Sequence, residues 1–139
     1  MARCGPMMIE FFMPMVPPTV TAQERKVRVV RGKPVFYDTP EINAARTKIE
    51  GHLGPHVPAD AMSGPVRLIT KWCFPCDRNA HMNGQWRDTR PDTDNLQKLL
   101  KDCMTHVGFW IDDAQVASEI TEKFWADVPG IYIRLEELT

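Results

Sequence analysis

Between residues 93 and 107, apolar side chains recur every three or four positions. Six residues follow this spacing: Leu96, Leu99, Leu100, Cys103, Met104 and Val107. A helix with about 3.6 residues per turn places such positions on one face, so the pattern predicts an amphipathic helix over 93–107 with one buried stripe. Asp92 or Thr93 can accept hydrogen bonds from the free N–H groups of its first turn, and Gly108 can take the left-handed conformation that ends it.

The rest of the chain shows the alternation of apolar and polar residues that is typical of strands, and one further pattern that is typical of a helix. Ile42, Ala45, Ile49 and Leu53 share one face of a helix that begins near Pro40. Strands are predicted at 8–13, 66–72, 116–124 and 131–135, together with a hairpin at 27–30 and 35–37 that turns at Gly32. These elements predict an α+β fold with a mixed sheet of about four to five strands packed with two helices. We expect one domain over residues 1–139, with a disordered head at 1–7.

Two acidic pairs bracket the predicted helix at 93–107. Asp92 and Asp94 stand at its start, and Asp112 and Asp113 follow the apolar run that comes after it. A return of the chain past the helix could bring the two pairs together. Converging aspartates repel one another unless a hard divalent cation lies among them, and Mg²⁺ prefers oxygen ligands of this kind. Each pair alone is more often a helix cap or a turn, whereas the combined pattern predicts a magnesium site.

Asp94, Lys98 and Asp102 form a polar row on this helix, because residues four apart share a helix face. The row places the ammonium group of Lys98 beside the carboxylates. A calcium-binding EF-hand is another interpretation of the acidic start, but it needs glycine where Gln97 stands and glutamate where Cys103 stands. The sequence therefore favours a magnesium site with a lysine beside it over a calcium loop.

Two motifs around this helix resemble those of one known family. The first runs Asp92-x-Asp94-Asn95-Leu96-Gln97-Lys98, and the second runs Gly108-Phe109-Trp110-x-Asp112-Asp113-Ala114-Gln115-Val116. Over these residues the chain is similar to the RusA family of Holliday junction resolvases. The resemblance implies a homodimeric, RusA-like endonuclease that cuts four-way DNA junctions with Mg²⁺, with Mn²⁺ as a substitute, and that is commonly carried by phages and prophages. It places the catalytic aspartates on Asp92, Asp94 and Asp113 and the catalytic lysine on Lys98.

The resemblance also implies a mechanism for these residues. Asp92, Asp94 and Asp113 would bind one or two Mg²⁺ ions, with Asp112 assisting or orienting, and Lys98 would stabilise developing charge or position the water. The expected products are paired symmetric nicks with 5′-phosphate and 3′-hydroxyl ends, formed in DNA recombination and repair by a C₂ dimer on a two-fold junction. Two alternatives stay open: a structure-selective DNA-binding protein of the same fold that does not cut, and a nuclease for flapped or otherwise branched DNA.

Charge is segregated along the chain, although the formal net charge is -1. Residues 1–101 hold 15 Lys/Arg and 10 Asp/Glu, while residues 102–139 hold 2 and 8. Residues 25–33 carry five basic side chains and no acid, which indicates a phosphate-binding surface, although charge that keeps an exposed hairpin soluble would look the same. Ahead of Asp92, the basic run is thinner than in the family. The residues predicted to bind DNA are Arg25, Lys26, Arg28, Arg31, Lys33, Arg87 and Arg90.

Other kinds of site and location fit the sequence less well. Cys73, Cys76 and His81 offer three zinc ligands and Cys103 a fourth, but their spacing matches no zinc module, so zinc is not expected. A sugar-nucleotide transferase needs a larger nucleotide-binding domain than 139 residues allow, so no nucleotide cofactor is expected. No apolar run approaches the roughly 20 residues that cross a bilayer, and no signal-peptide layout is present. We therefore expect a cytoplasmic protein with reduced thiols and no membrane partner.

Overall fold

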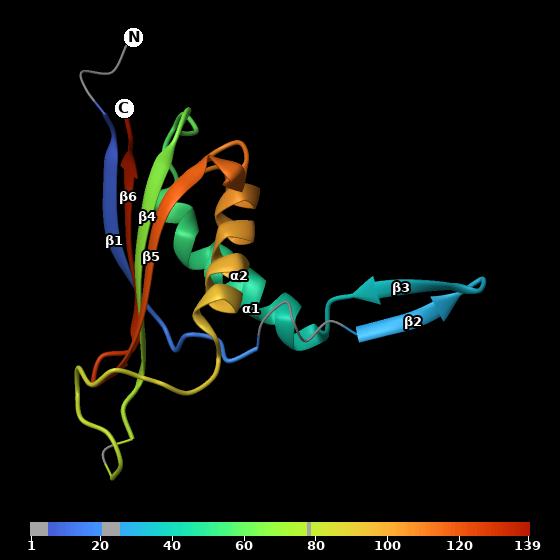
Figure 1. The fold of residues 1–139 in the computed structure, drawn as a ribbon, viewed down its shortest axis with the longest axis horizontal. Helices are drawn as coiled ribbons and strands as arrows, with labels where there is room; N and C mark the ends of the chain where they lie inside the picture. Colours follow the sequence, from blue (N-terminus) through green and yellow to red (C-terminus); the bar gives the residue numbers. More distant parts are fainter. Residues whose placement is uncertain (1–5, 21–25, 78) are drawn as a thin grey trace.

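Two helices cover a four-stranded mixed sheet, and a two-stranded ribbon extends from this body (Figure 1). The computed structural model describes residues 6–20, 26–77 and 79–139. Its strands are β1 (Met8–Pro14), β2 (Lys26–Val30), β3 (Lys33–Tyr37), β4 (Val66–Pro75), β5 (Val116–Ala126) and β6 (Gly130–Glu137). Its helices are α1 (Pro40–Leu53) and α2 (Thr93–Val107), with short 3-10 turns η2 (Gly54–His56) and η3 (Asp113–Gln115). The predicted α+β class, the two helices and the predicted strands are confirmed.

The main sheet has the strand order β1-β6-β4-β5. Strand β6 pairs antiparallel with both β1 and β4, whereas β4 and β5 are parallel. A parallel pair needs a crossover, and α2 is the helix within it. Strand β5 therefore starts near the C-terminal end of α2 and runs back toward its N-terminal end (Figure 1). In the segment 1–7 that is predicted to be disordered, the carbonyl of Met7 accepts a hydrogen bond at 2.9 Å from the backbone N–H of Glu137. Residues 1–5 of this segment lie outside the residues that the structure describes.

The apolar stripe of α2 packs against the sheet in one core. The stripe residues Leu96, Leu99, Leu100, Cys103 and Met104 are buried, as predicted. Gly108 follows with a φ of 103°, the left-handed conformation that ends the helix. Both helices lie on the same side of the main sheet (Figure 1). In the described ranges, neither combines the length and the apolarity that a membrane crossing needs.

A buried chain of hydrogen bonds joins α2 to β4. Oγ1 of Thr70 donates to Oε1 of Gln97 at 3.0 Å, and Nε1 of Trp72 donates to the same Thr70 oxygen at 3.0 Å. All three residues are 2% exposed or less. A buried polar group that loses its hydrogen-bond partner lowers the stability of the fold. These hydrogen bonds therefore fix the position of the first turns of α2 against β4. They thereby position the part of the helix that carries the acidic residues.

Strands β2 and β3 form a separate antiparallel ribbon that projects away from the main sheet and the helices (Figure 1). Arg31 and Gly32 connect the two strands with φ values of 51° and 76°. Two positive φ values in a two-residue loop are typical of the type I′ turn, whose twist matches that of the flanking strands. The predicted hairpin and its glycine turn are confirmed, and the main sheet has four strands without it.

Candidate active site

The segment that leads into α2 runs along the end of β5. The backbone N–H of Trp125 donates to the carbonyl of Gln85 at 2.8 Å, and the N–H of Arg87 donates to the carbonyl of Lys123 at 3.0 Å. The Arg87 guanidinium lies over the rings of Phe74 and Trp125, at 4.1 and 4.5 Å from their centroids. These contacts give the approach to the acidic helix a defined course along an edge strand.

The side chain of Lys123 binds the same segment just before Asp92. Its Nζ donates to the carbonyls of Thr89 and Pro91, both at 2.7 Å. Burial lowers the pKa of Lys123 and the nearby Arg87 lowers it further, whereas Asp92 and Asp88 act in the opposite direction. The Lys123 ammonium therefore lies within the electrostatic reach of the first predicted catalytic aspartate. No sequence motif marks Lys123, because its partners are backbone carbonyls 34 and 32 residues earlier in the chain.

Asp92, Asp94 and Lys98 lie at the N-terminal end of α2 and are all exposed. Asp92 occupies the N-cap position with φ -74° and ψ 148°, but its carboxylate makes no capping hydrogen bond. Of the two residues predicted to cap the helix, Asp92 or Thr93, Asp92 stands at the N-cap position without the expected side-chain hydrogen bond, and its carboxylate remains available to bind other groups. Lys98 follows Asp94 by one helical turn, which places the two side chains about 5–6 Å apart at their Cβ atoms.

Asp112 and Asp113 lie at the other end of α2, in and before η3. Asp112 accepts a hydrogen bond from the N–H of Ala114 at 2.8 Å, and Oε1 of Gln115 accepts from the N–H of Asp112 at 3.1 Å. Nε2 of Gln115 also donates to the carbonyls of Met62 and Gly64, both at 2.9 Å. Asp112 is thus part of a capping box, whereas Asp113 is half-buried on the wall of a shallow hollow of about 470 Å³.

The two acidic pairs do not converge within one chain. Asp113 lines a hollow with Asp102, Thr105 and His106 in the second half of α2, whereas Asp92 and Asp94 stand at the start of that helix. Among the residues that the structure describes, no three His, Cys, Asp or Glu side chains lie close enough to hold one metal ion. The chain does return past the helix, as β5, but Asp113 stands at the start of that return. The residue that arrives beside Asp92 is Lys123, ten positions later.

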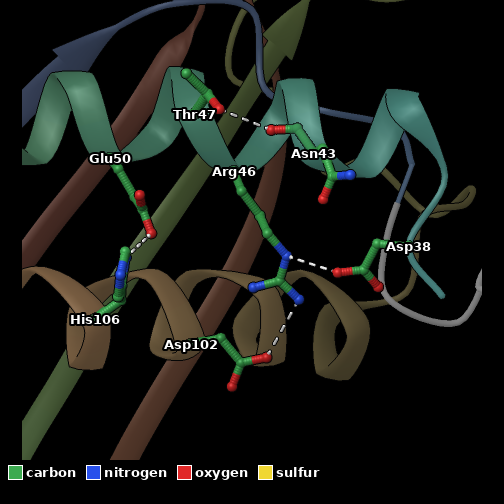
Figure 2. A pocket seen from close by; sticks show the side chains of 7 residues that line it. All are labelled: Asp38, Asn43, Arg46, Thr47, Glu50, Asp102 and His106. Atoms are coloured by element: carbon green, nitrogen blue, oxygen red, sulfur yellow. Dashed lines mark hydrogen bonds and ion pairs between the residues drawn. The ribbon is translucent and has the colours of Figure 1, made fainter. Parts of the chain in front are cut away.

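Figure 2 shows a polar groove between α1 and α2. This groove shares Asp102 and His106 with the hollow that Asp113 lines. Arg46 of α1 pairs with Asp38 at 3.4 Å and with Asp102 of α2 at 3.7 Å. His106 of α2 contacts Glu50 of α1 through Nδ1 at 2.7 Å. Asp102 therefore takes part in a link between the helices, in addition to its place one helical turn after Lys98. The groove of about 600 Å³ is lined by groups that already pair with one another.

The predicted DNA-binding residues fall in two places. Arg31 and Lys33 are exposed at the tip of the ribbon, and the Arg28 guanidinium lies over the Tyr37 ring at 5.3 Å. Arg25 and the side chain of Lys26 lie outside the described residues. On the approach to α2, Arg90 is exposed, while burial lowers the pKa of Arg87 on its aromatic platform. Trp86 beside it is 62% exposed, with its ring 4.5 Å from that of Phe124.

The cysteines and His81 take part in local packing. The thiol of Cys76 donates to the carbonyl of His81 at 2.8 Å, and the His81 ring stacks on Trp125 at 4.0 Å. Cys103 is buried in the stripe of α2, and burial is the main cause that raises its pKa to about 12. Burial also raises the pKa of Cys73. The raised pKa values keep the thiols of Cys73 and Cys103 protonated at neutral pH.

Comparison with known proteins points to one family. The sequence model of the family described as Endodeoxyribonuclease RusA matches residues 15–136. A crossover junction endodeoxyribonuclease of Lactococcus phage r1t is 29% identical over 120 residues, which is 85% of this chain and 89% of the relative. The uncharacterized protein YqaN of Bacillus subtilis (strain 168) is 26% identical over 94 residues, covering 60% and 66%. The crossover junction endodeoxyribonuclease of Escherichia coli (strain K12) is 63% identical over 27 residues, covering 19% and 22%.

Proposed function

Because the chain belongs to the RusA family of endodeoxyribonucleases, we propose that it resolves four-way DNA junctions by Mg²⁺-dependent paired nicking. The phage relative that it matches over 89% of that protein's length carries the name of a crossover junction endodeoxyribonuclease. The observation that carries the proposal is the start of α2, where Asp92, Asp94 and Lys98 are exposed together on a helix joined to the core. Exposed carboxylates and an ammonium group at one end of a rigid element suit phosphodiester chemistry.

The donor set at the start of α2 suits Mg²⁺. Mg²⁺ is commonly bound by one or two carboxylates together with substrate phosphate oxygens, and Asp92 and Asp94 supply two carboxylates that face solvent. The bound ion would polarise the scissile phosphate and lower the pKa of the attacking water. Lys98 would donate to the phosphate oxygens as negative charge develops there. The expected ends are 5′-phosphate and 3′-hydroxyl.

The position of Asp113 supports a homodimer. In one chain it lies beside the second half of α2, whereas Asp92 and Asp94 stand at the start of that helix, so a second chain would have to supply the third carboxylate. A C₂ dimer would form two such sites at once, each with Asp92 and Asp94 of one chain and Asp113 of the other. Two equivalent sites are what paired cuts on opposing strands of a junction need.

Two surfaces would contact the DNA backbone. The ribbon presents Arg28, Arg31 and Lys33, and the approach to α2 presents Arg90. Lysine and arginine near phosphates release counterions, so such contacts give affinity that falls as salt concentration rises. Arg87 would act through its packing on Phe74 and Trp125, which orients the segment beside Asp92.

Cleavage of four-way, flapped and linear duplex DNA by the purified protein, with Mg²⁺ or with EDTA, tests the proposal. We expect paired symmetric nicks on the four-way substrate that disappear in EDTA and in an Asp94→Asn variant, because the metal then loses a carboxylate. We expect the reduction in rate for Asp94→Asn to be at least about a hundredfold, in line with the loss of a group that acts on the reacting phosphate.

Asp102→Asn is the matched control, because it removes a carboxylate of the same helix that pairs with Arg46 instead of facing solvent beside Asp94. Its cleavage rate should stay within a few-fold of the unmodified chain. Binding of the four-way substrate without any cutting would contradict the nuclease and favour a structure-selective binding protein. Equal cutting of flapped or linear DNA would contradict junction selectivity.

A further inference from the structure

Trp86 keeps most of its indole ring in solvent, unlike the other three tryptophans of the chain. Trp72 and Trp110 are buried in the core and Trp125 is half-buried, whereas Trp86 is 62% exposed. Tryptophan is among the residues that contribute most to binding when a partner covers them, because its ring is large, flat and rigid. The exposed indole therefore offers a binding surface that the proposed nuclease chemistry does not use.

The backbone on both sides of Trp86 is held by hydrogen bonds to β5. The carbonyl of Gln85 accepts a hydrogen bond from this strand at 2.8 Å, and the N–H of Arg87 donates to it at 3.0 Å. Trp86 itself stands opposite Phe124 in an antiparallel bridge, with the ring centroids 4.5 Å apart and the ring planes inclined by 32°. The indole is thus supported by a second ring yet largely open, which prepares it to receive a flat ligand at low entropic cost.

The same segment leads from Trp86 to the start of α2. Asp92 follows Trp86 by six positions, and an extended chain spans at most about 3.3–3.6 Å per residue, so their Cα atoms lie within about 22 Å of each other. Along duplex DNA this distance corresponds to at most about six base steps of 3.4 Å. Arg90 is exposed between the two residues and offers a phosphate contact. A strand bound at Asp92 and Asp94 therefore passes within reach of the indole.

The chemistry of the indole selects a nucleobase as the ligand. Every base has an aromatic face that stacks on indole, whatever the sequence. In a continuous duplex these faces are covered by the neighbouring base pairs, so a base must leave the stack before it can contact Trp86. Leaving the stack costs least where pairing is already interrupted, as at a branch point or a bulge. Phosphate contacts, by contrast, are available along the whole duplex.

We propose that Trp86 is a stacking site for one unpaired base at or next to a branch point in DNA. This assignment rests on the proposed function and deepens it, because it names a feature of branched DNA that the protein recognises. The indole contacts the substrate away from the reacting phosphate, so it selects the substrate and does not take part in the cut. Four-way DNA is then held both by its backbone and by one base that continuous duplex does not offer.

Binding of a four-way junction in EDTA tests the assignment without cleavage. A Trp86→Leu variant keeps an apolar side chain but loses the ring, so the dissociation constant should rise at least about fivefold, whereas Trp86→Phe should stay within about threefold. Met82→Ala is the matched control, because Met82 is 78% exposed in the same loop but has no ring, and it should change the constant by less than about twofold. Relaxed circular duplex should bind all four proteins equally. An unchanged constant for Trp86→Leu on the junction would contradict the assignment.

Trp86→Leu should also leave the course of the segment intact, because Arg87, not Trp86, packs on the rings of Phe74 and Trp125. A thermal unfolding midpoint equal to that of the unmodified chain checks this. A second measurement keeps the native indole. Under ultraviolet light 5-iodouracil cross-links to an aromatic ring on which it stacks, and mass spectrometry identifies the peptide. We expect the peptide that contains Trp86 when 5-iodouracil stands at the branch point or is the unpaired base of a bulged duplex, and not when it is paired within an arm.

The outcomes separate this assignment from the proposed nuclease. Cross-linking to the bulged duplex without any preference for four-way DNA would support the stacking site and contradict junction selectivity. Absence of the Trp86 peptide with both substrates would overturn the assignment and leave the indole to a protein partner. Neither assay needs Mg²⁺ or a cut, so a chain that binds and cross-links but never cleaves would sustain the stacking site while contradicting the nuclease.

Discussion

Lys123 shows how one residue can join strand β5 to the segment just before the acidic start of α2. Its ammonium donates to the carbonyls of Thr89 and Pro91 and lies near Asp92. A Lys123→Met variant keeps the chain length but leaves both carbonyls without this donor, which should lower the free energy of unfolding by about 1–3 kcal/mol. Because Asp92 follows directly, we also expect at least tenfold slower junction cleavage at saturating Mg²⁺. Thermal unfolding and single-turnover kinetics measure the two effects.

The matched control is Lys101→Met, since Lys101 makes a surface pair with Glu119 at 3.3 Å and surface pairs contribute about 0–1 kcal/mol. Lys123→Arg should recover part of the cleavage rate, because a guanidinium can also donate to both carbonyls. A Lys123→Met variant that is less stable yet cuts at the normal rate would show that Lys123 supports the fold without positioning Asp92.

At the scale of the element, the orientation of α2 depends on Thr70, Gln97 and Trp72. Thr70→Val keeps the shape of the side chain but removes the donor to Gln97 and the acceptor for Trp72, so two buried groups lose their partners. We expect the free energy of unfolding to fall by about 2–4 kcal/mol. Thr121→Val, at the paired position of β5, is the control and should change it by less than about 1 kcal/mol. Urea unfolding of both variants tests this prediction. An equal fall in the free energy of unfolding would contradict the role of the buried hydrogen bonds.

The elements themselves could be predicted from sequence, but their contacts could not. Periodicity places α2, its buried stripe and Gly108, because local spacing decides which side chains share a face. The same spacing places Asp102 one helical turn after Lys98, but it does not show that Asp102 also pairs with Arg46 of α1. The distance between Asp94 and Asp113 depends on where β5 starts relative to α2, which no local pattern contains. The partners of Lys123 are backbone groups, and these leave no residue signature.

At the scale of the molecule, the proposed metal site is incomplete in a single chain. Its third predicted metal ligand, Asp113, lies beside the second half of α2, whereas Asp92 and Asp94 stand at the start of that helix. The proposed dimer would complete the site, since one chain would supply Asp113 while its partner supplies Asp92 and Asp94. The segregated charge fits the same arrangement, because the first 101 residues are net basic and the last 38 are net acidic.

Mixed dimers test whether the metal site is shared between chains. An Asp94→Asn dimer and an Asp113→Asn dimer should each be inactive. In a heterodimer of the two variants, a shared arrangement places both substitutions in one site and leaves the other site with its full set of carboxylates. Differently tagged chains, co-expressed and purified as heterodimers, should therefore nick one strand of a four-way junction at a rate near that of one native site. If each site belonged to one chain, both sites would lack a ligand and the heterodimer would be as inactive as its parents.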